Sequence, residues 1–172
     1  FGLKVIETLP ALVPLTFGED ILKECKELSG LSVEAQVSYD KTLFEEGMLF
    51  THRGLSGPSI LQISSYWKLG ECIQVNLLPN QNIFSYLEEK KLHSPKQEIN
   101  SIINELLPKR LANMICDNLK VSGRIADMSK KVLILISDFI NKWIIKPTGT
   151  EGYRTAEVTL GGVDTKELSS NT

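Results

Sequence analysis

SVEAQVSY, residues 32–39, alternates polar and apolar side chains with a period of two. Such alternation predicts a β-strand with one buried and one solvated face. Further strands are expected where the same alternation or a short apolar run bounded by proline or glycine occurs: residues 12–17, 48–51, 73–77 and 156–160. Short strands joined by irregular loops favour a small mixed or antiparallel sheet or barrel.

The pattern changes to a helical period between about residues 82 and 145. SPKQ at 94–97 is a typical helix start, with a side-chain cap, a proline at the first position and a glutamine at the capping-box position. Pro108 is expected to end this helix and open a second one. Ser129 is expected to cap a third helix, whose apolar face extends through residues 143–144.

Strands on both sides of a helical segment predict an α+β fold: a small β-barrel-like sheet with an inserted helical subdomain. The expected division assigns residues 1–80 and 146–172 to the barrel-like part and residues 81–145 to the helical subdomain.

Composition and charge restrict the function classes. Hydrophobic residues make up 42% of the 172 residues and charged residues 23%, as in ordinary globular proteins. Nineteen Lys and Arg against twenty-one Asp and Glu give a net charge of -2, so neither nucleic acid nor a membrane is expected as a partner. No apolar run approaches the roughly 20 residues that span a bilayer, and no secretory signal is visible.

The cysteines favour a reducing compartment. Cys25, Cys72 and Cys116 are odd in number and widely spaced, which predicts buried reduced thiols in a cytoplasmic protein. With two histidines in the chain and no CxxC pair, no metal site is expected.

FTHRGLSGP at 50–58 is the stretch with the most distinctive chemistry. It predicts a strand end, a glycine-punctuated loop and a helix with Pro58 at its first position. The free N–H groups of that helix start, with His52 and Arg53 before it, would suit an anionic or carbonyl-bearing ligand. A tight structural turn, in which the glycines only permit positive φ, is an equally good interpretation from physics alone.

Two sharper motifs fail in this stretch. A phosphate-binding P-loop needs a lysine after its second glycine, and Pro58 follows Gly57 instead. A nucleophile elbow needs a glycine two residues after Ser56, where Pro58 also stands, so hydrolysis by Ser56 and His52 has little support.

TLGGV at 159–163 is a second glycine cluster, placed after the last expected strand. Paired glycines let the backbone approach a flat ligand, but they also make an ordinary turn. The chain has no GxGxxG fingerprint after a first strand, so it carries no dinucleotide cradle of its own.

Three segments carry a resemblance to a known family: PALVPL at 10–15, EGMLFTHRGLSGP at 46–58 and AEVTLGGV at 156–163. Along nearly its whole length the sequence resembles bacterial FAD-dependent flavoproteins, the NAD(P)/FAD-dependent or aminoacetone-oxidase-family oxidoreductases. The resemblance implies an insert with a barrel-like and a helical part, spliced into a discontinuous FAD domain. The family's glycine-rich FAD fingerprint and closing segment are not in this sequence, so an excised domain is expected.

The resemblance also implies roles for particular residues. Those resembling the family's substrate-side loop are His52, Arg53, Gly54, Ser56 and Gly57. Those resembling the return point into the FAD domain, where the backbone can approach the flavin and help bind it, are Thr159, Gly161, Gly162 and Val163. No side chain is a convincing general base, so no catalytic residue is assigned.

The function expected from the resemblance is the substrate-side insert of an FAD-dependent oxidoreductase, which shapes the pocket and is not catalytic alone. FAD would be held by the FAD-binding domain of the same polypeptide, with NAD(P)H as a reductant and a small molecule as substrate, and this segment alone would bind no FAD. The alternative is a non-catalytic module whose helical subdomain docks a protein partner through an apolar groove. Met114, Phe139 and Trp143 could be groove or core residues, and their place on the stripes that pack helices together favours the core.

Overall fold

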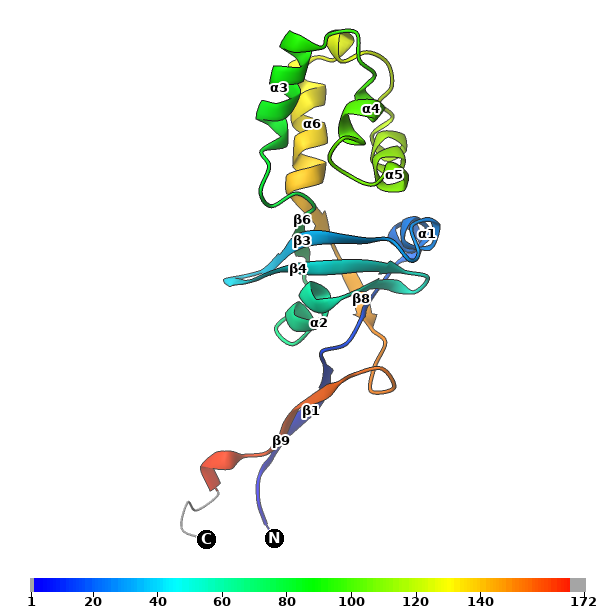
Figure 1. The fold of residues 1–172 in the computed structure, drawn as a ribbon. Coiled ribbons are helices and arrows are strands. Elements are labelled where there is room, and N and C mark those ends of the chain that lie inside the picture. The colour runs from blue at the N-terminus through cyan, green and yellow to red at the C-terminus, as the bar shows by residue number, and fades with distance from the viewer. Residues whose placement is uncertain (1, 168–172) are drawn as a thin grey trace.

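Residues 2–167 are described by the computed structural model. A helical part, a barrel and a two-stranded ribbon follow one another along the length of the molecule (Figure 1). The expected α+β class is confirmed.

Seven short strands form the barrel: β2 (Leu15–Phe17), β3 (Ser32–Tyr39), β4 (Thr42–Thr51), β5 (Gly54–Ser56), β6 (Ile73–Asn76), β7 (Trp143–Ile145) and β8 (Pro147–Thr150). Their order in the sheet is β7-β6-β3-β4-β5-β2-β8, and every pair is antiparallel. The two outer strands, β7 and β8, are separated in the chain by Lys146 alone. One bent strand therefore pairs with both ends of the sheet and closes it, which removes the free edges.

Alternation along β3 was predicted correctly. Ala35 and Val37 are fully buried, while Glu34 on the other face is exposed. In the core, the rings of Phe50 and Trp143 stack with their centroids 6.5 Å apart. Contacts of this kind account for much of the packing energy of a small barrel.

Four helices follow one another between β6 and β7: α3 (Ile83–His93), α4 (Ile99–Ile103), α5 (Lys109–Leu119) and α6 (Lys130–Asn141). A short 3-10 helix, η1 (Ile125–Asp127), precedes α6. The ring of Phe139 in α6 stacks on Trp143 at 5.6 Å, so one aromatic row joins the helical core to the barrel core. The division into two domains at the expected boundaries stays a prediction.

Two more helices pack against the barrel, α1 (Glu19–Glu27) and α2 (Pro58–Ser64). The ribbon pairs β1 (Val5–Ala11) with β9 (Val158–Val163) in an antiparallel register, and η2 (Thr165–Glu167) follows it. Within residues 2–167 no helix has the length and apolar character needed to cross a membrane.

The starts of the second and third predicted helices were interpreted correctly, but the first does not run to Pro108, because α4 ends at Ile103. Pro108 immediately precedes α5, and the Ser129 hydroxyl accepts a hydrogen bond from the Val132 N–H at 3.3 Å. Both are typical helix starts. The serine hydroxyl pairs with an N–H group of the first turn, and proline has no N–H group that would be left unpaired.

The helix start predicted at 94–97 was wrong. The Ser94 N–H donates to the Lys90 carbonyl at 2.7 Å and ends α3, and the Gln97 N–H closes a turn onto the Ser94 carbonyl. The same residues can mark either end of a helix, because proline is also common just after a helix C-terminus. Here Ser94 and Pro95 follow the end of α3. The next helix begins at Ile99.

The expected extension of the third helix through residues 143–144 was also wrong. The Lys142 N–H donates to the Asp138 carbonyl and ends the helix, and Trp143 then pairs with Val75 of β6. Aromatic and β-branched side chains fit a half-buried strand as well as a helix face, so periodicity alone could not separate the two.

Candidate functional site

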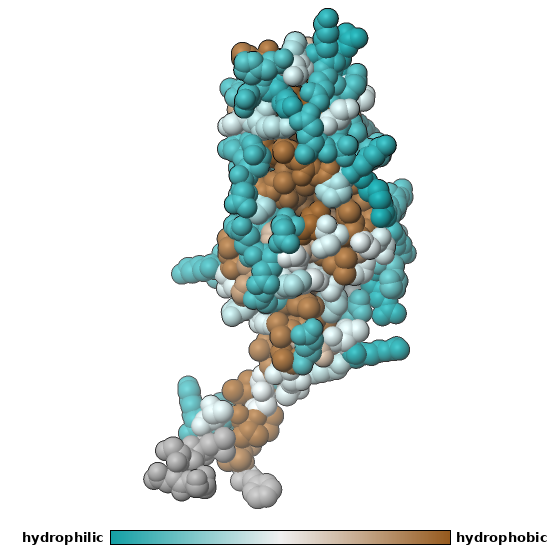
Figure 2. Space-filling view, viewed as in Figure 1, coloured by the Kyte–Doolittle hydropathy of each residue, from teal (hydrophilic) through white to brown (hydrophobic). Residues whose placement is uncertain are grey.

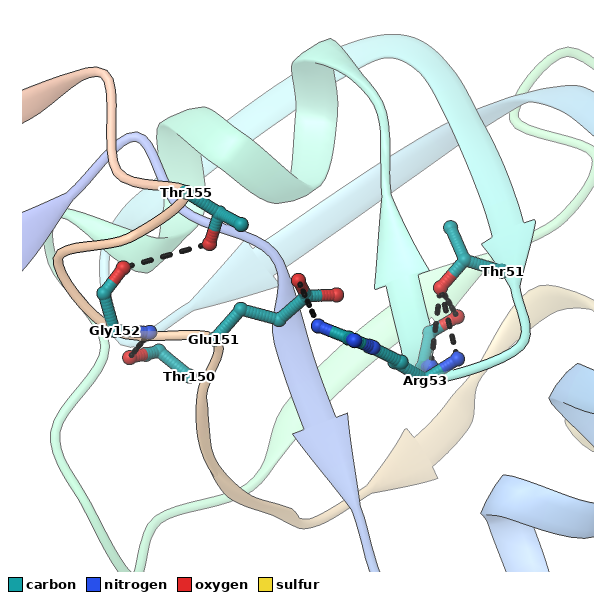
Figure 3. Close-up of polar contacts among 7 residues, drawn as sticks. Thr51, Arg53, Thr150, Glu151, Gly152 and Thr155 are labelled. Carbon is teal, nitrogen blue, oxygen red and sulfur yellow. Dashed lines mark hydrogen bonds and ion pairs between the residues drawn. The ribbon is translucent and has the colours of Figure 1, made fainter.

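The turn between β4 and β5 is built around one hydroxyl. Thr51 Oγ1 accepts hydrogen bonds from the N–H groups of Arg53 and Gly54, both at 3.2 Å, and donates to the Gly54 carbonyl at 3.1 Å (Figure 3). These bonds fix the backbone of the turn and leave the side chains of His52 and Arg53 exposed at its tip.

An ion pair joins this turn to the loop between β8 and β9. Arg53 Nη1 lies 3.4 Å from Glu151 Oε2, and the Glu151 side chain is only 13% exposed (Figure 3). The loop is fixed in turn, because the Gly152 N–H donates to Thr150 Oγ1 and the Thr155 hydroxyl donates to the Gly152 carbonyl. Arg53 is therefore a cation fixed against the loop that leads from β8 to the ribbon strand β9.

Gly57 and Ser56 lie at the other end of β5 from His52 and Arg53. Gly57 has a φ of 91°, and a Cβ there would stand 2.7 Å from the Gly47 carbonyl oxygen. The Ser59 hydroxyl is buried and donates to the same carbonyl at 3.1 Å. This part of the predicted substrate-side loop has a packing role that accounts for its glycine, and α2, with seven residues, is a short helix.

Gly54 is equally constrained by packing. A Cβ on this residue would lie 2.1 Å from the Leu15 carbonyl oxygen of the adjacent strand β2. Of the five residues predicted for the substrate-side loop, His52 and Arg53 are the two with exposed side chains, and Ser56 is half-buried.

The ribbon places the two glycines of TLGGV in different surroundings. Gly161 has a φ of 81° and packs against β1, where a Cβ would stand 2.1 Å from the Glu7 carbonyl oxygen. Gly162 has a φ of 106°, and a Cβ there would have no atom within 4 Å among the described residues. Gly161 is explained by the close approach of β1 as well as by its φ, whereas Gly162 is explained by its positive φ alone and has open space at its Cβ position.

Apolar side chains cover the ribbon although it stands away from the core (Figure 2). Its exposed members, between 39% and 65% accessible, are Val5, Ile6, Leu9, Val158, Leu160 and Val163. Two-stranded ribbons are marginal in water, and clustered exposed apolar side chains mark interaction surfaces. The ribbon is the strongest candidate for a surface that another folded part covers.

An apolar hollow of about 560 Å³ opens where the ribbon meets the barrel. Leu9 and Leu160 of the ribbon form one wall, and Trp67 and Leu69 after α2 form another. Leu160 stands within TLGGV, so the hollow adjoins the predicted flavin-side residues. Sequence reasoning missed Glu151, Trp67 and Leu69, because only the fold brings them beside Arg53 or the ribbon.

The flavin can be compared with the residues present. Bare backbone at Gly162 and the apolar side chains around it fit the flat ring system of a flavin. The described residues lack the glycine-rich helix start that holds a pyrophosphate. Most of an FAD site would have to come from another part of the protein.

Within residues 2–167 no group of three or more His, Cys, Asp or Glu side chains is placed to hold a metal ion. Cys25 and Cys116 are buried as expected, but Cys72 is exposed, so the prediction of three buried thiols was wrong for it. Cys72 lies just before β6, in a loop whose neighbours are also exposed.

The three side chains that could be core or groove residues pack into the core, as their place on the helix stripes favoured. Met114 and Trp143 are 6% and 5% exposed and belong to the core, and Phe139 packs against Trp143. These side chains hold the helices and the barrel together.

The fold is a closed barrel interrupted by a helical part, with β1 and β9 paired in an apolar ribbon beside it. The chain belongs to the family described as HI0933-like protein barrel and H2TH domain, which matches residues 9–158. This is the family of the insert found in FAD-associated flavoproteins, so the resemblance seen in the sequence is confirmed at that level.

Two curated relatives carry a more specific name. The chain is 46% identical over its whole length to the ribosomal RNA dihydrouridine synthase of Escherichia coli (strain K12), covering 44% of that protein. It is 44% identical over its whole length to the ribosomal RNA dihydrouridine synthase of Haemophilus influenzae (strain ATCC 51907 / DSM 11121 / KW20 / Rd), covering 43% of it. The chain thus spans less than half the length of these relatives.

Proposed function

We propose that this chain is the substrate-side part of an FAD-dependent enzyme that reduces uridine in ribosomal RNA to dihydrouridine. The observation that carries the proposal is 46% identity, without loss of coverage on this chain, to a ribosomal RNA dihydrouridine synthase. It replaces the expectation of a small-molecule substrate by a nucleotide within a large RNA.

The chemistry defines what the site must do. Dihydrouridine is uridine with a hydride and a proton added across the C5–C6 double bond of the base. A bound reduced flavin would supply the hydride, and NAD(P)H would then reduce the oxidised flavin again. The protein must hold the base flat against the flavin, exclude water and support the negative charge that develops on the uracil carbonyls.

Arg53 suits the last of these tasks. Its guanidinium is a permanent cation with several N–H donors, and Glu151 holds it in place at 3.4 Å. His52 stands beside it at the tip of the same turn. We assign both side chains to the uracil carbonyls or a neighbouring phosphate, with Thr51 as the residue that fixes their backbone.

The ribbon suits the tasks of docking and of excluding water. Its apolar side chains would be buried against the FAD-binding part of the same polypeptide. The bare backbone of Gly162, flanked by Thr159 and Val163, would then approach the flavin, while Gly161 keeps β9 close to β1.

RNA as a partner conflicts with the expectation drawn from net charge. That expectation averaged two unlike regions: residues 81–145 carry ten Lys and Arg against seven Asp and Glu, whereas the rest of the chain carries nine against fourteen. An overall charge of -2 therefore hides a net positive helical region.

Gene deletion tests the proposal. Ribosomal RNA from a strain lacking the gene is digested to nucleosides, and dihydrouridine is quantified by mass spectrometry. We expect dihydrouridine to be lost and to return with the wild-type gene. The R53A variant should restore little, while R154A, which removes an exposed arginine from the adjoining β8–β9 loop, should restore it fully. Unchanged dihydrouridine in the deletion strain would overturn the proposal.

A further inference from the structure

A second hollow, of about 650 Å³, lies between the barrel and the helical part and, unlike the first, is mainly polar. Its lining comes from elements other than those of the candidate site. Side-chain amides dominate its lining: Gln36 and Gln74 from the sheet, and Asn80, Gln81 and Asn82 from the segment before α3. Phe84 of α3 and Lys142 after α6 also line the hollow. We call this feature the amide hollow.

One half-buried asparagine, Asn141, fixes the shape of the amide hollow. The side-chain N–H groups of Asn141 donate to Asn76 Oδ1 and to the carbonyls of Leu78 and Gln81, at 2.9 to 3.1 Å. Its oxygen accepts the Ile83 N–H at 3.1 Å. Because all its groups are paired, Asn141 fixes the shape of the hollow and is not itself available to a ligand.

Other amides of the hollow remain available. The side chains of Gln74 and Asn80 are exposed and make no hydrogen bond within residues 2–167. Each amide offers both donors and an acceptor, the combination that pairs with the edge of a nucleobase. An aromatic face stands beside them in Phe84, and single-stranded nucleic acids stack their bases on such faces.

One cation, Lys142, lines the amide hollow, and a second, Lys130, lies over the ring of one lining residue. Lys130 Nζ lies 5.6 Å from the centre of the Phe84 ring. Lys142 lies at the opposite end of α6, about 18 Å away along the helix axis. Asp138 is the acidic residue in the lining, and it is paired with Lys142 at 3.4 Å. Amides, an aromatic face and terminal cations resemble a nucleic-acid groove more than a protein-docking surface, whose centre is usually apolar.

We propose that the amide hollow binds an unpaired nucleotide of the substrate RNA, with Gln74 and Asn80 on the base edge, Phe84 against the base face, and Lys130 and Lys142 near the flanking phosphates. This inference rests on the proposed function, since that function supplies the RNA. The hollow would anchor the RNA at a distance from the uridine that is reduced.

Binding of a fluorescein-labelled oligouridylate of about ten nucleotides to the intact protein, followed by fluorescence anisotropy at one fixed salt concentration, tests the inference. We expect F84L and the double variant Q74A/N80A each to weaken binding about tenfold. The matched double variant Q62A/N104A, which removes two amides outside the hollow, should bind as the wild type does.

The amide variant decides the test even if F84L unfolds, because Gln74 and Asn80 are exposed. RNA affinity equal to that of the wild type in Q74A/N80A would overturn the inference. The same result is expected if the hollow binds a protein and not RNA. Dihydrouridine formation is measured separately. If dihydrouridine is lost in the gene deletion but Q74A/N80A binds RNA as the wild type does, only the RNA-binding role of the amide hollow is contradicted. Weakened RNA binding with unchanged dihydrouridine in the deletion would contradict the proposed reaction alone.

Discussion

Arg53 and Glu151 lie 98 residues apart in the sequence, yet Nη1 of one and Oε2 of the other are 3.4 Å apart. The whole helical part lies between these two residues in the sequence. Their ion pair fixes the β4–β5 turn against the loop that leads to the ribbon. Exposed ion pairs contribute only about 0–1 kcal/mol to stability, so this one is better explained by positioning than by folding energy.

Replacing Glu151 by glutamine separates these two roles. In E151Q the carboxylate charge is lost, and we expect the melting temperature to change by no more than a few degrees, as about 1 kcal/mol implies. Dihydrouridine formation should fall at least tenfold, because a neutral amide oxygen replaces the carboxylate charge that holds Arg53. A loss of activity that merely parallels a large loss of thermal stability would contradict the positioning role.

Gly162 can be compared with Gly30, since both have positive φ and open space at the Cβ position. G162A and G30A should suffer similar backbone strain, of about 1–2 kcal/mol. In the intact protein we expect only G162A to lower the flavin content or to slow flavin reduction, because its methyl group would enter the space between ribbon and flavin. Equal flavin content and reduction rates in the two variants would show that Gly162 is only a turn residue.

Gly161 should respond differently from both. A Cβ would overlap the Glu7 carbonyl oxygen, so G161A must shift β9 away from β1. We expect increased proteolytic cleavage at the ribbon with the barrel intact, measured by limited proteolysis and mass spectrometry. A ribbon as resistant as that of the wild type would contradict the packing role.

Glu105 gives a pH-dependent prediction. Hydrogen bonds from Lys90, Tyr86 and Gln97, at 2.5 to 2.6 Å, lower the pKa of this carboxyl from 4.5 to about 2. A lowered pKa in the folded state means that the contribution to stability is present above pH 4.5 and is lost as the pH falls toward 2. E105Q should therefore be less stable than the wild type at pH 7, and the difference should vanish near pH 2. A difference that stays constant from pH 7 to pH 2 in urea unfolding would contradict this account.

Glu24 should show the opposite sign. Burial raises the pKa of its carboxyl above 4.5, and Oε2 is buried without a hydrogen-bond partner among the described residues. A raised pKa favours the folded state at low pH, and the ionised group opposes folding as the pH rises above 4.5. E24Q keeps an oxygen for Asn118, so at pH 7 it should be at least as stable as the wild type. Marked destabilisation of E24Q at pH 7 would contradict the prediction.

Local patterns predicted much of this fold. The alternation of residues 32–39, the proline before α5 and the serine cap of α6 all lie where the sequence indicated. Helix α1 gave no such signal, since its first turn follows Gly18 and has no side-chain cap. The bend at Lys146 that closes the barrel depends on pairing with two distant strands, which no local pattern records.

The candidate site was predictable only in part. His52 and Arg53 could be found because a glycine-punctuated turn that carries a histidine beside an arginine is unusual. Gly54 and Gly57 looked equally suited to a ligand, but each is required by a neighbouring backbone carbonyl. Glu151 and the amide hollow arise from residues brought together across the helical part, so their roles appear only in three dimensions.

Reduction of uridine by the purified protein tests the central claim most directly. The intact protein with bound FAD is mixed with NAD(P)H and ribosomal RNA from the deletion strain, and dihydrouridine is quantified by mass spectrometry. The account predicts dihydrouridine in amounts that rise with enzyme and time, and a strong decrease in the H52A/R53A double variant with bound flavin retained. Flavin that is reduced by NAD(P)H and reoxidised without forming any dihydrouridine in intact RNA would contradict it.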